Sequence, residues 1–193
     1  IESSFYLTGG TALHRFYYHE RYSDDLDFFT NESKLFSYEY KDIRAGLSKE
    51  FEMSDIIDTH GFKRIIIHED TIKLKIDFVN DIAFRVGNPV VKNDILIDNI
   101  PNMLTNKISA ILGRDNPKDV FDIMSINRHY DIDWNEILTF TANKISFEID
   151  ELIIRLKEFP VALLEKLSTR KKIDLIKCDN DLSTIINTIH RMY

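Results

Sequence analysis

The chain has 193 residues, of which 44% are hydrophobic and 30% charged, and its formal net charge is −7. This composition is ordinary for a folded globular protein, and the length suits one compact domain or two small ones. The single cysteine, Cys178, excludes an internal disulfide framework and offers no zinc site. The acidic balance argues against broad, non-specific binding of nucleic acid.

No apolar stretch is long enough to cross a membrane, so we expect a cytoplasmic protein with no membrane partner. The chain begins at Ile1 rather than Met, and we therefore expect that a segment before Ile1 is missing.

Residues 7–29, LTGGTALHRFYYHERYSDDLDFF, combine a glycine pair with an acidic pair. We expect a strand over residues 5–8, a helix over 11–20 and a strand over 25–30. Strand side chains alternate between faces, so Asp25 and Asp27 lie together while Leu26 and Phe28 face the core. Two adjacent carboxylates repel, and a divalent ion such as Mg²⁺ would relieve that repulsion.

The residues Gly9, Gly10 and Thr11 precede the expected helix and supply backbone N–H groups near its N-terminus, where phosphate groups bind. Taken alone, a glycine pair is usually a turn and an acidic pair usually a solvated surface. The coupling of a phosphate-type turn, one helix and two carboxylates on one strand face predicts a site for a metal and a nucleotide.

Farther along the chain we expect a helix over residues 35–53, a hairpin of 62–68 and 71–79, and one more strand near 90–97. In the second hairpin strand, Asp77 lies on the polar face, opposite an apolar face made of Ile72, Leu74, Ile76 and Phe78. Considered alone, Asp77 is an ordinary solvent-facing residue.

After residue 100 the pattern is helical to the end, with breaks expected near 116–117, 131–133, 160 and 179–181. Pro101 suits the first turn of a helix that runs to about Leu112, where Gly113 can end it. On this helix Lys107, Ile111 and Arg114 share one stripe.

Asn116 can cap the next helix, with Pro117 at its first position. Asp119 and Asp122, three residues apart, share a face of this helix. A carboxylate at this position is also favourable with the helix dipole, so capping and catalysis are both open for Asp119.

The glycine pair, the intervening helix and the Asp-x-Asp pair resemble the first motif of the DNA polymerase β-like nucleotidyltransferase superfamily. The fuller string LTGGTAL followed by RYSDDLDFF, with Arg21 and Ser23 before the acidic pair, resembles the AbiEii/AbiGii-type toxins of abortive-infection and toxin–antitoxin systems. The resemblance spans roughly residues 5–127.

Three further segments fit this family. Asp77 matches the third carboxylate of the metal site, and Lys107-Ile108-Ser109-Ala110-Ile111 matches a K-[IL]-x-A-[IL] motif whose lysine contacts the nucleotide triphosphate. Asp119 and Asp122 match a D-x-x-D motif. The family often has arginine before the first Asp; Lys118 stands there in this chain and lacks the bidentate fork.

The resemblance implies an α+β fold, with a nucleotidyltransferase-type mixed-sheet catalytic domain at residues 1–99. A helical C-terminal bundle at 100–193 would contribute nucleotide contacts and select the acceptor. The implied reaction is Mg²⁺-dependent transfer of a nucleoside monophosphate from an NTP. The implied catalytic residues are Asp25, Asp27, Asp77 and Asp119; two Mg²⁺ ions would be held by Asp25, Asp27 and Asp77; and the nucleotide would be bound by Gly9, Gly10, Thr11, Ser23 and Lys107.

The implied acceptor is RNA, specifically a tRNA 3′ end, with growth arrest as the consequence and an antitoxin encoded nearby. A small molecule or a protein hydroxyl is an alternative acceptor, and a non-catalytic binding module is an alternative from another class. The intact set of Asp25, Asp27 and Asp77 argues against the last.

Arg170, Lys171 and Lys172 form a basic cluster, with Lys166 one turn away. This cluster would contact an RNA backbone or form a solvated helix end, and we favour the second interpretation.

Overall fold

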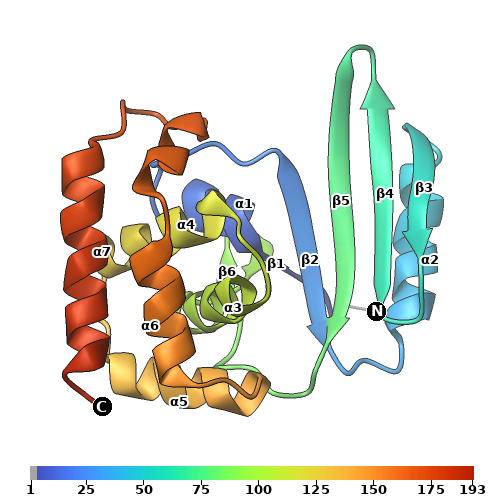
Figure 1. The fold of residues 1–193 in the computed structure, drawn as a ribbon. Helices are drawn as coiled ribbons and strands as arrows, with labels where there is room; N and C mark the ends of the chain where they lie inside the picture. The colour runs from blue at the N-terminus through green and yellow to red at the C-terminus, as the bar shows by residue number, and fades with distance from the viewer. Residues whose placement is uncertain (1–3) are drawn as a thin grey trace. The chain divides into compact units, whose positions relative to one another are not determined.

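The structure is a computed structural model that describes residues 4–193, and these fold into two units (Figure 1). Unit 1 comprises residues 4–17 and Ser23–Asp98, and unit 2 comprises Tyr18–Tyr22 and Asn99–Tyr193. Unit 2 therefore includes a short N-terminal segment as well as the C-terminal half of the chain. No helix of residues 4–193 is both long and apolar enough to span a membrane.

The described part of unit 1 is built on a mixed sheet of seven strands in the order β3-β4-β5-β2-β1-β7-β6. Neighbouring strands are antiparallel except for the pairs β2–β5 and β1–β7, which are parallel. The strands are β1 (Tyr6–Thr8), β2 (Asp25–Asn31), β3 (Glu52–Asp58), β4 (Phe62–Glu69), β5 (Ile72–Asp81), β6 (Val90–Lys92) and β7 (Ile95–Ile97).

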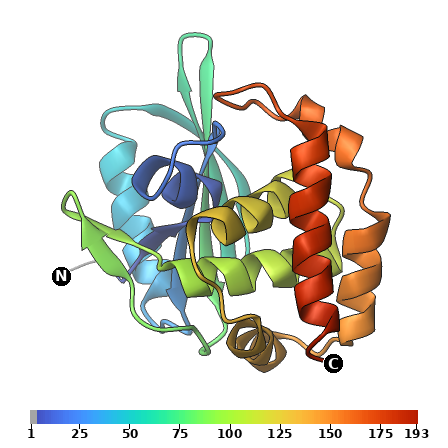
Figure 2. The same ribbon diagram turned by 90° about the vertical axis from the view of Figure 1, so that its left-hand side faces the viewer.

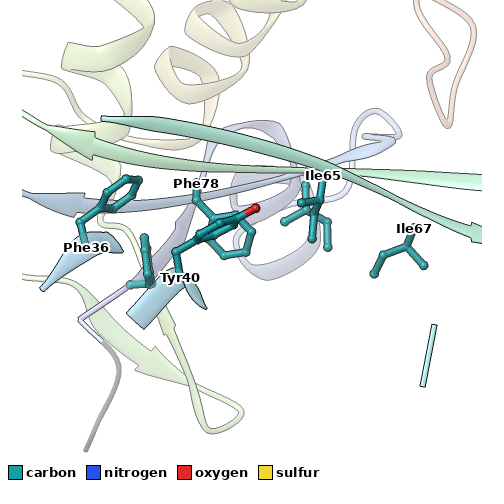
Figure 3. Packing of buried hydrophobic residues seen from close by; sticks show 7 residues of the cluster. Phe36, Tyr40, Ile65, Ile67 and Phe78 are labelled. Atoms are coloured by element: carbon teal, nitrogen blue, oxygen red, sulfur yellow. The ribbon is translucent and has the colours of Figure 1, made fainter. Parts of the chain in front are cut away.

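Helix α1 (Gly9–Phe16) follows β1 directly, and α2 (Phe36–Leu47) packs on one face of the sheet. Figure 3 shows this core, where Phe36 and Tyr40 of α2 meet Ile65, Ile67 and Phe78 of the sheet. Leu26 and Phe28 of β2 pack against the same cluster, and the rings of Phe28 and Phe78 stack with centroids 5.6 Å apart. The apolar side chains of β2, β4 and β5 thus occupy one face of the sheet.

Unit 2 consists mainly of helices, and α6 and α7 lie side by side in it (Figures 1 and 2). Four of the helices begin at an Asn or Asp whose side chain accepts a backbone N–H of the first turn: Asn99, Asn116, Asp133 and Asp174. Its elements are α3 (Ile100–Gly113), α4 (Pro117–His129), α5 (Trp134–Lys144), α6 (Ile149–Glu158), the 3₁₀ helix η1 (Val161–Lys166) and α7 (Leu175–His190).

The predicted fold class is confirmed: a mixed-sheet α+β unit is followed by a helical bundle. One strand was missed, because the helix expected over residues 35–53 ends at Leu47 and residues 52–58 form β3. β3 has largely exposed side chains and no clean apolar alternation. Its backbone pairing with β4, from Glu52↔His68 to Asp58↔Lys63, holds this edge strand in place.

Three further expectations about elements are corrected. The strand expected near 90–97 is a pair of short strands that reverses at Asn93 and Asp94, both with positive φ. Helix α7 continues through the break expected at 179–181, because Leu182, Ile185 and Ile189 bury its apolar face. The break between α5 and α6 at residues 145–148 was not anticipated.

Candidate active site

The three predicted metal ligands lie on adjacent parallel strands of unit 1. In the β2–β5 register Asp27 is the direct partner of Asp77, and Asp25 is the partner of Lys75. Because Leu26, Phe28 and Phe78 point into the core under α2, the alternation of strand side chains places Asp25, Asp27 and Asp77 together on the opposite face. Asp77 is nearly buried, and the side chain of Asp25 is one-third exposed.

Two cations pair with two of these carboxylates, Asp77 and Asp25. Arg64 of β4 donates from Nε and Nη2 to the two oxygens of Asp77, both at 2.7 Å. Lys75 lies on the same strand face, with Nζ 2.8 Å from Asp25 Oδ2 and 4.0 Å from Asp77 Oδ2. The hydrogen bonds to Asp77 raise the pKa of Arg64 above its ordinary value, and the charges of Asp77, Asp25 and Asp27 add to this effect against partial burial.

The partners of the carboxylates were not predicted, although the sequence contains a signal for each. The hairpin turn between β4 and β5 sets the register in which Arg64 faces Asp77, and Lys75 precedes Asp77 by two residues on its strand. Among the described residues no three acidic, His or Cys side chains are grouped as a ready metal site. The donor set itself fits Mg²⁺, which prefers carboxylate oxygens, and each Asp77 oxygen keeps a second lone pair beside its bond to Arg64.

The glycine turn lies against Asp27. Thr8, the last residue of β1, is the register partner of Asp27, and the chain turns at Gly9, the first residue of α1, with φ +69°. A Cβ atom at Gly9 would overlap the Oδ2 atom of Asp27. The absence of a side chain therefore lets the N-terminus of α1 approach the carboxylate closely.

The hydroxyls next to this turn have structural partners. Thr8 Oγ1 donates to Asp98 Oδ2 at 2.7 Å, and Thr11 Oγ1 donates to the backbone carbonyl of Asp25. The backbone N–H groups in the first turn of a helix lack intrahelical partners. In α1 the Thr8 side chain makes no capping bond to them. The predicted phosphate cradle at Gly9, Gly10 and Thr11 would consist of these N–H groups. Ser23 is half-buried two residues before β2.

A Gly9→Ala variant tests this close approach. We expect it to lose most transfer activity, because alanine is strained at positive φ and its Cβ displaces Asp27. Activity assays and thermal unfolding would be compared with those of Gly46→Ala in α2, where an added Cβ meets no atom within 4 Å. The control should keep full activity and gain about 0.5–1 kcal/mol of stability. Full activity in Gly9→Ala would contradict the proposed role of this turn.

The predicted residues of α3 and α4 form a buried ion network in unit 2. Lys107 Nζ lies 2.7 Å from Asp119 Oδ1 and 2.8 Å from Asp122 Oδ2. Arg21 donates from Nε and Nη2 to the two oxygens of Asp122, each at 2.7 Å. Arg114 donates to Asp119 at 2.8 Å. The two carboxylates are 1% exposed or less.

The network shows which partners the motif residues Arg21, Lys107 and Asp122 have in the folded chain. Burial alone would lower the pKa of Lys107, but the charges of Asp122 and Asp119 raise it above its ordinary value. Arg21 was noted only as part of a motif, and the structure shows that it is the bidentate partner of Asp122. In this structure the side chains of Lys107 and Asp119 form an ion pair with each other. A contact of Lys107 with the nucleotide and a catalytic role of Asp119 stay predictions.

The sequence matches a known protein family along most of its length. Residues 1–176 match the family described as nucleotidyl transferase AbiEii toxin, type IV TA system. The chain belongs to the AbiEii nucleotidyltransferase toxin family. The predicted resemblance is thereby confirmed, and the protein is a nucleotidyltransferase of a toxin family.

Relatives of this AbiEii chain include an uncharacterized protein of Aquifex aeolicus, aq_aa25. The two are 30% identical over an alignment of 152 residues that covers 75% of this chain and 68% of the relative. JHP933 from Helicobacter pylori is similar in structure, with a TM-score of 0.64 and 20% identity over 99% of this chain and 85% of that one. MenT4, a nucleotidyltransferase toxin from Mycobacterium tuberculosis, also has a TM-score of 0.64, with 12% identity over 96% and 75% of the two chains. The two structural likenesses show a shared fold.

Proposed function

We propose that this protein transfers a nucleoside monophosphate from an NTP to a hydroxyl of RNA, with a tRNA 3′ end as the acceptor. The observation that carries this proposal is the register of β2 and β5, in which Asp27 and Asp77 are direct partners on the face that also holds Asp25. Gly9 places the N-terminus of α1 against the same Asp27. Carboxylates for a metal and N–H groups for phosphate are therefore neighbours in unit 1.

In this proposal Asp25, Asp27 and Asp77 would hold Mg²⁺. Bound there, Mg²⁺ would lower the pKa of the attacking hydroxyl and stabilise the charge of the pyrophosphate leaving group. Arg64 pairs with Asp77 and Lys75 pairs with Asp25, and these two cations compensate part of the like-charge repulsion. This pairing would help to preorganise the proposed metal site.

The remaining residues would orient the nucleotide. The first-turn N–H groups at Gly9, Gly10 and Thr11 would donate to its phosphates, and Ser23 would add a hydroxyl near the start of β2. We propose that Lys107 adds positive charge for the triphosphate and that Asp119 keeps the Lys107 ammonium in position. This chemistry needs orientation and electrostatic stabilisation rather than a covalent intermediate on the protein.

The proposal is tested by incubating the protein with each radiolabelled NTP, Mg²⁺ and total bacterial RNA. We expect label to move to tRNA and the reaction to stop when EDTA removes the metal. Label on a small molecule or on protein instead would replace RNA by that acceptor. Labelling of none of the three would overturn the transferase activity proposed for this chain.

Toxicity is tested in growing bacteria. The AbiEii family is one of toxin–antitoxin systems, so we expect the wild-type chain to slow growth and a neighbouring gene to relieve the effect. Asp25→Asn should not slow growth, whereas Asp24→Asn, which changes an exposed neighbour, should act like the wild type. If neither the wild-type chain nor Asp25→Asn slows growth, the toxin role is overturned.

A further inference from the structure

Unit 2 contains a pocket with a basic rim. Its volume is about 370 Å³, within the range of pockets that take a nucleotide-sized ligand. One wall is the loop of residues 169–174 between η1 and α7, together with Lys177 of α7. The other wall comes from α4 and from residues 18–20. The basic cluster expected as a helix end is therefore part of a loop that lines a pocket.

The basic rim carries positive charge without an ion-pair partner in the described chain; its residues are Arg170, Lys171, Lys172 and Lys177. Within residues 4–193, no ion pair involves the side chains of Arg170, Lys171, Lys172 or Lys177. The lining carboxylate of Glu20 is neutralised by Arg128, at a short ion-pair distance, and accepts from His129 at 2.9 Å. Asp174 is the other lining carboxylate, and it caps α7 through the N–H of Lys177. A local positive excess thus exists in a chain whose net charge is −7.

The inner part of the pocket is apolar and aromatic. Tyr18, Phe121 and Cys178 line it and are all buried. The His129 ring stacks on Tyr18, with centroids 4.4 Å apart and an interplanar angle of 18°, and its side chain remains 41% exposed. The exposed His129 ring, backed by Tyr18, offers surface to a nucleobase, and the cations that line the same pocket offer charge to a phosphate.

The rim is fixed to the segment that leads into the carboxylate strand. Tyr22 N–H donates to the carbonyl of Ser168 at 2.8 Å, and Arg170 N–H donates to the carbonyl of Glu20 at 2.9 Å. Arg21 and Thr169 form an isolated antiparallel bridge between these two segments. The backbone around Arg170 is consequently held in position, which lowers the entropic cost of ordering it on a ligand.

We propose that this pocket binds a nucleotide unit of the acceptor RNA, with the base against the aromatic wall and the backbone phosphates against the basic rim. The inference rests on the proposed function, because it names the part of unit 2 that takes the RNA. Cations without carboxylate partners beside an exposed ring such as that of His129 are the chemistry of proteins that bind single-stranded RNA. A local cluster of cations at one pocket reconciles RNA binding with an acidic chain.

The test measures binding of fluorescently labelled bulk bacterial tRNA to the full chain, without NTP or Mg²⁺, over a series of salt concentrations. In the variant Lys171→Glu/Lys172→Glu we expect affinity at low salt to fall about tenfold or more, and the slope of log affinity against log salt to decrease in magnitude by about two. The control is Lys157→Glu/Arg191→Glu, which makes the same charge change at exposed positions outside the pocket. The control should bind like the wild type.

Each outcome separates this inference from the proposed function. Equal binding by the two double variants, or no tRNA binding by the wild-type chain, would overturn the pocket assignment whether or not label reaches RNA. Displacement of tRNA by millimolar ATP would overturn it in favour of a free-nucleotide pocket. Pocket-dependent tRNA binding without any transfer of label would support the pocket and overturn the transferase proposal alone. Circular dichroism and thermal unfolding establish that both variants are folded.

Discussion

Asp27→Asn should lower nucleotidyl transfer by about a thousandfold or more. An amide supplies neither the charge nor the second anionic oxygen that a divalent metal needs, and such stabilisation is worth several kcal/mol, each 1.36 kcal/mol being tenfold in rate. The substitution also removes one of three carboxylates on a crowded strand face, so the fold should persist. Initial rates with saturating NTP and RNA, together with thermal unfolding, measure both quantities.

The matched control for this prediction is Asp24→Asn. Asp24 precedes β2, is exposed and is three residues from Asp27, so the chemical change is the same at a nearby position. Its rate should stay within about twofold of wild type, since surface substitutions away from special features change little. If Asp27→Asn retains the wild-type rate while folded, the carboxylate face is not the catalytic centre.

Lys107→Met should destabilise the protein by about 3 kcal/mol, because it leaves two buried carboxylates without the cation that they share. Arg21 and Arg114 remain on Asp122 and Asp119 and limit the loss. Urea unfolding measures the change. Lys118→Met is the control, since Lys118 is the neighbouring half-buried cation with no ion pair among the described residues, and its effect should stay within about 0.5 kcal/mol.

Activity of a folded Lys107 variant tests its other predicted role. Lys107→Ala, assayed well below its unfolding temperature, should raise the apparent KM for NTP and lower kcat, because a cation at the triphosphate serves both binding and the transition state. Lowered stability with unchanged KM and kcat would make Lys107 a structural residue. An unfolding midpoint equal to that of the wild type would contradict the role of the ion network itself.

Local patterns predicted the elements that position the carboxylates. Strand alternation was sufficient to place Asp25 and Asp27 on one face, and Asp77 on the polar face of its own strand. Proline and asparagine at the starts of α3 and α4 marked those helices correctly. These features depend on neighbours a few residues apart, which a single sequence displays directly.

Features that depend on distant residues were not predicted. β3 is defined by its pairing with β4 rather than by its own alternation. The contact between Arg21 and Asp122 joins residues 101 apart in the chain, and no periodicity reveals it. The continuity of α7 through Asp179–Asp181 likewise depends on tertiary partners, including the 2.8 Å ion pair between Asp181 and Arg128.

The assignment of Tyr18–Tyr22 to unit 2 has a consequence for exchanging parts between relatives. The chain leaves unit 1 after Tyr17 and returns at Ser23, so a chimera joined only at residues 98 and 99 would combine Arg21 from one parent with Asp122 from the other. Recombinants that inherit residues 18–22 from the same parent as residues 99–193 would keep the bidentate pair and the backbone bonds to Ser168 and Arg170 intact. Whether a substitution in residues 18–22 is tolerated should therefore depend on the sequence of residues 99–193 in the same chain.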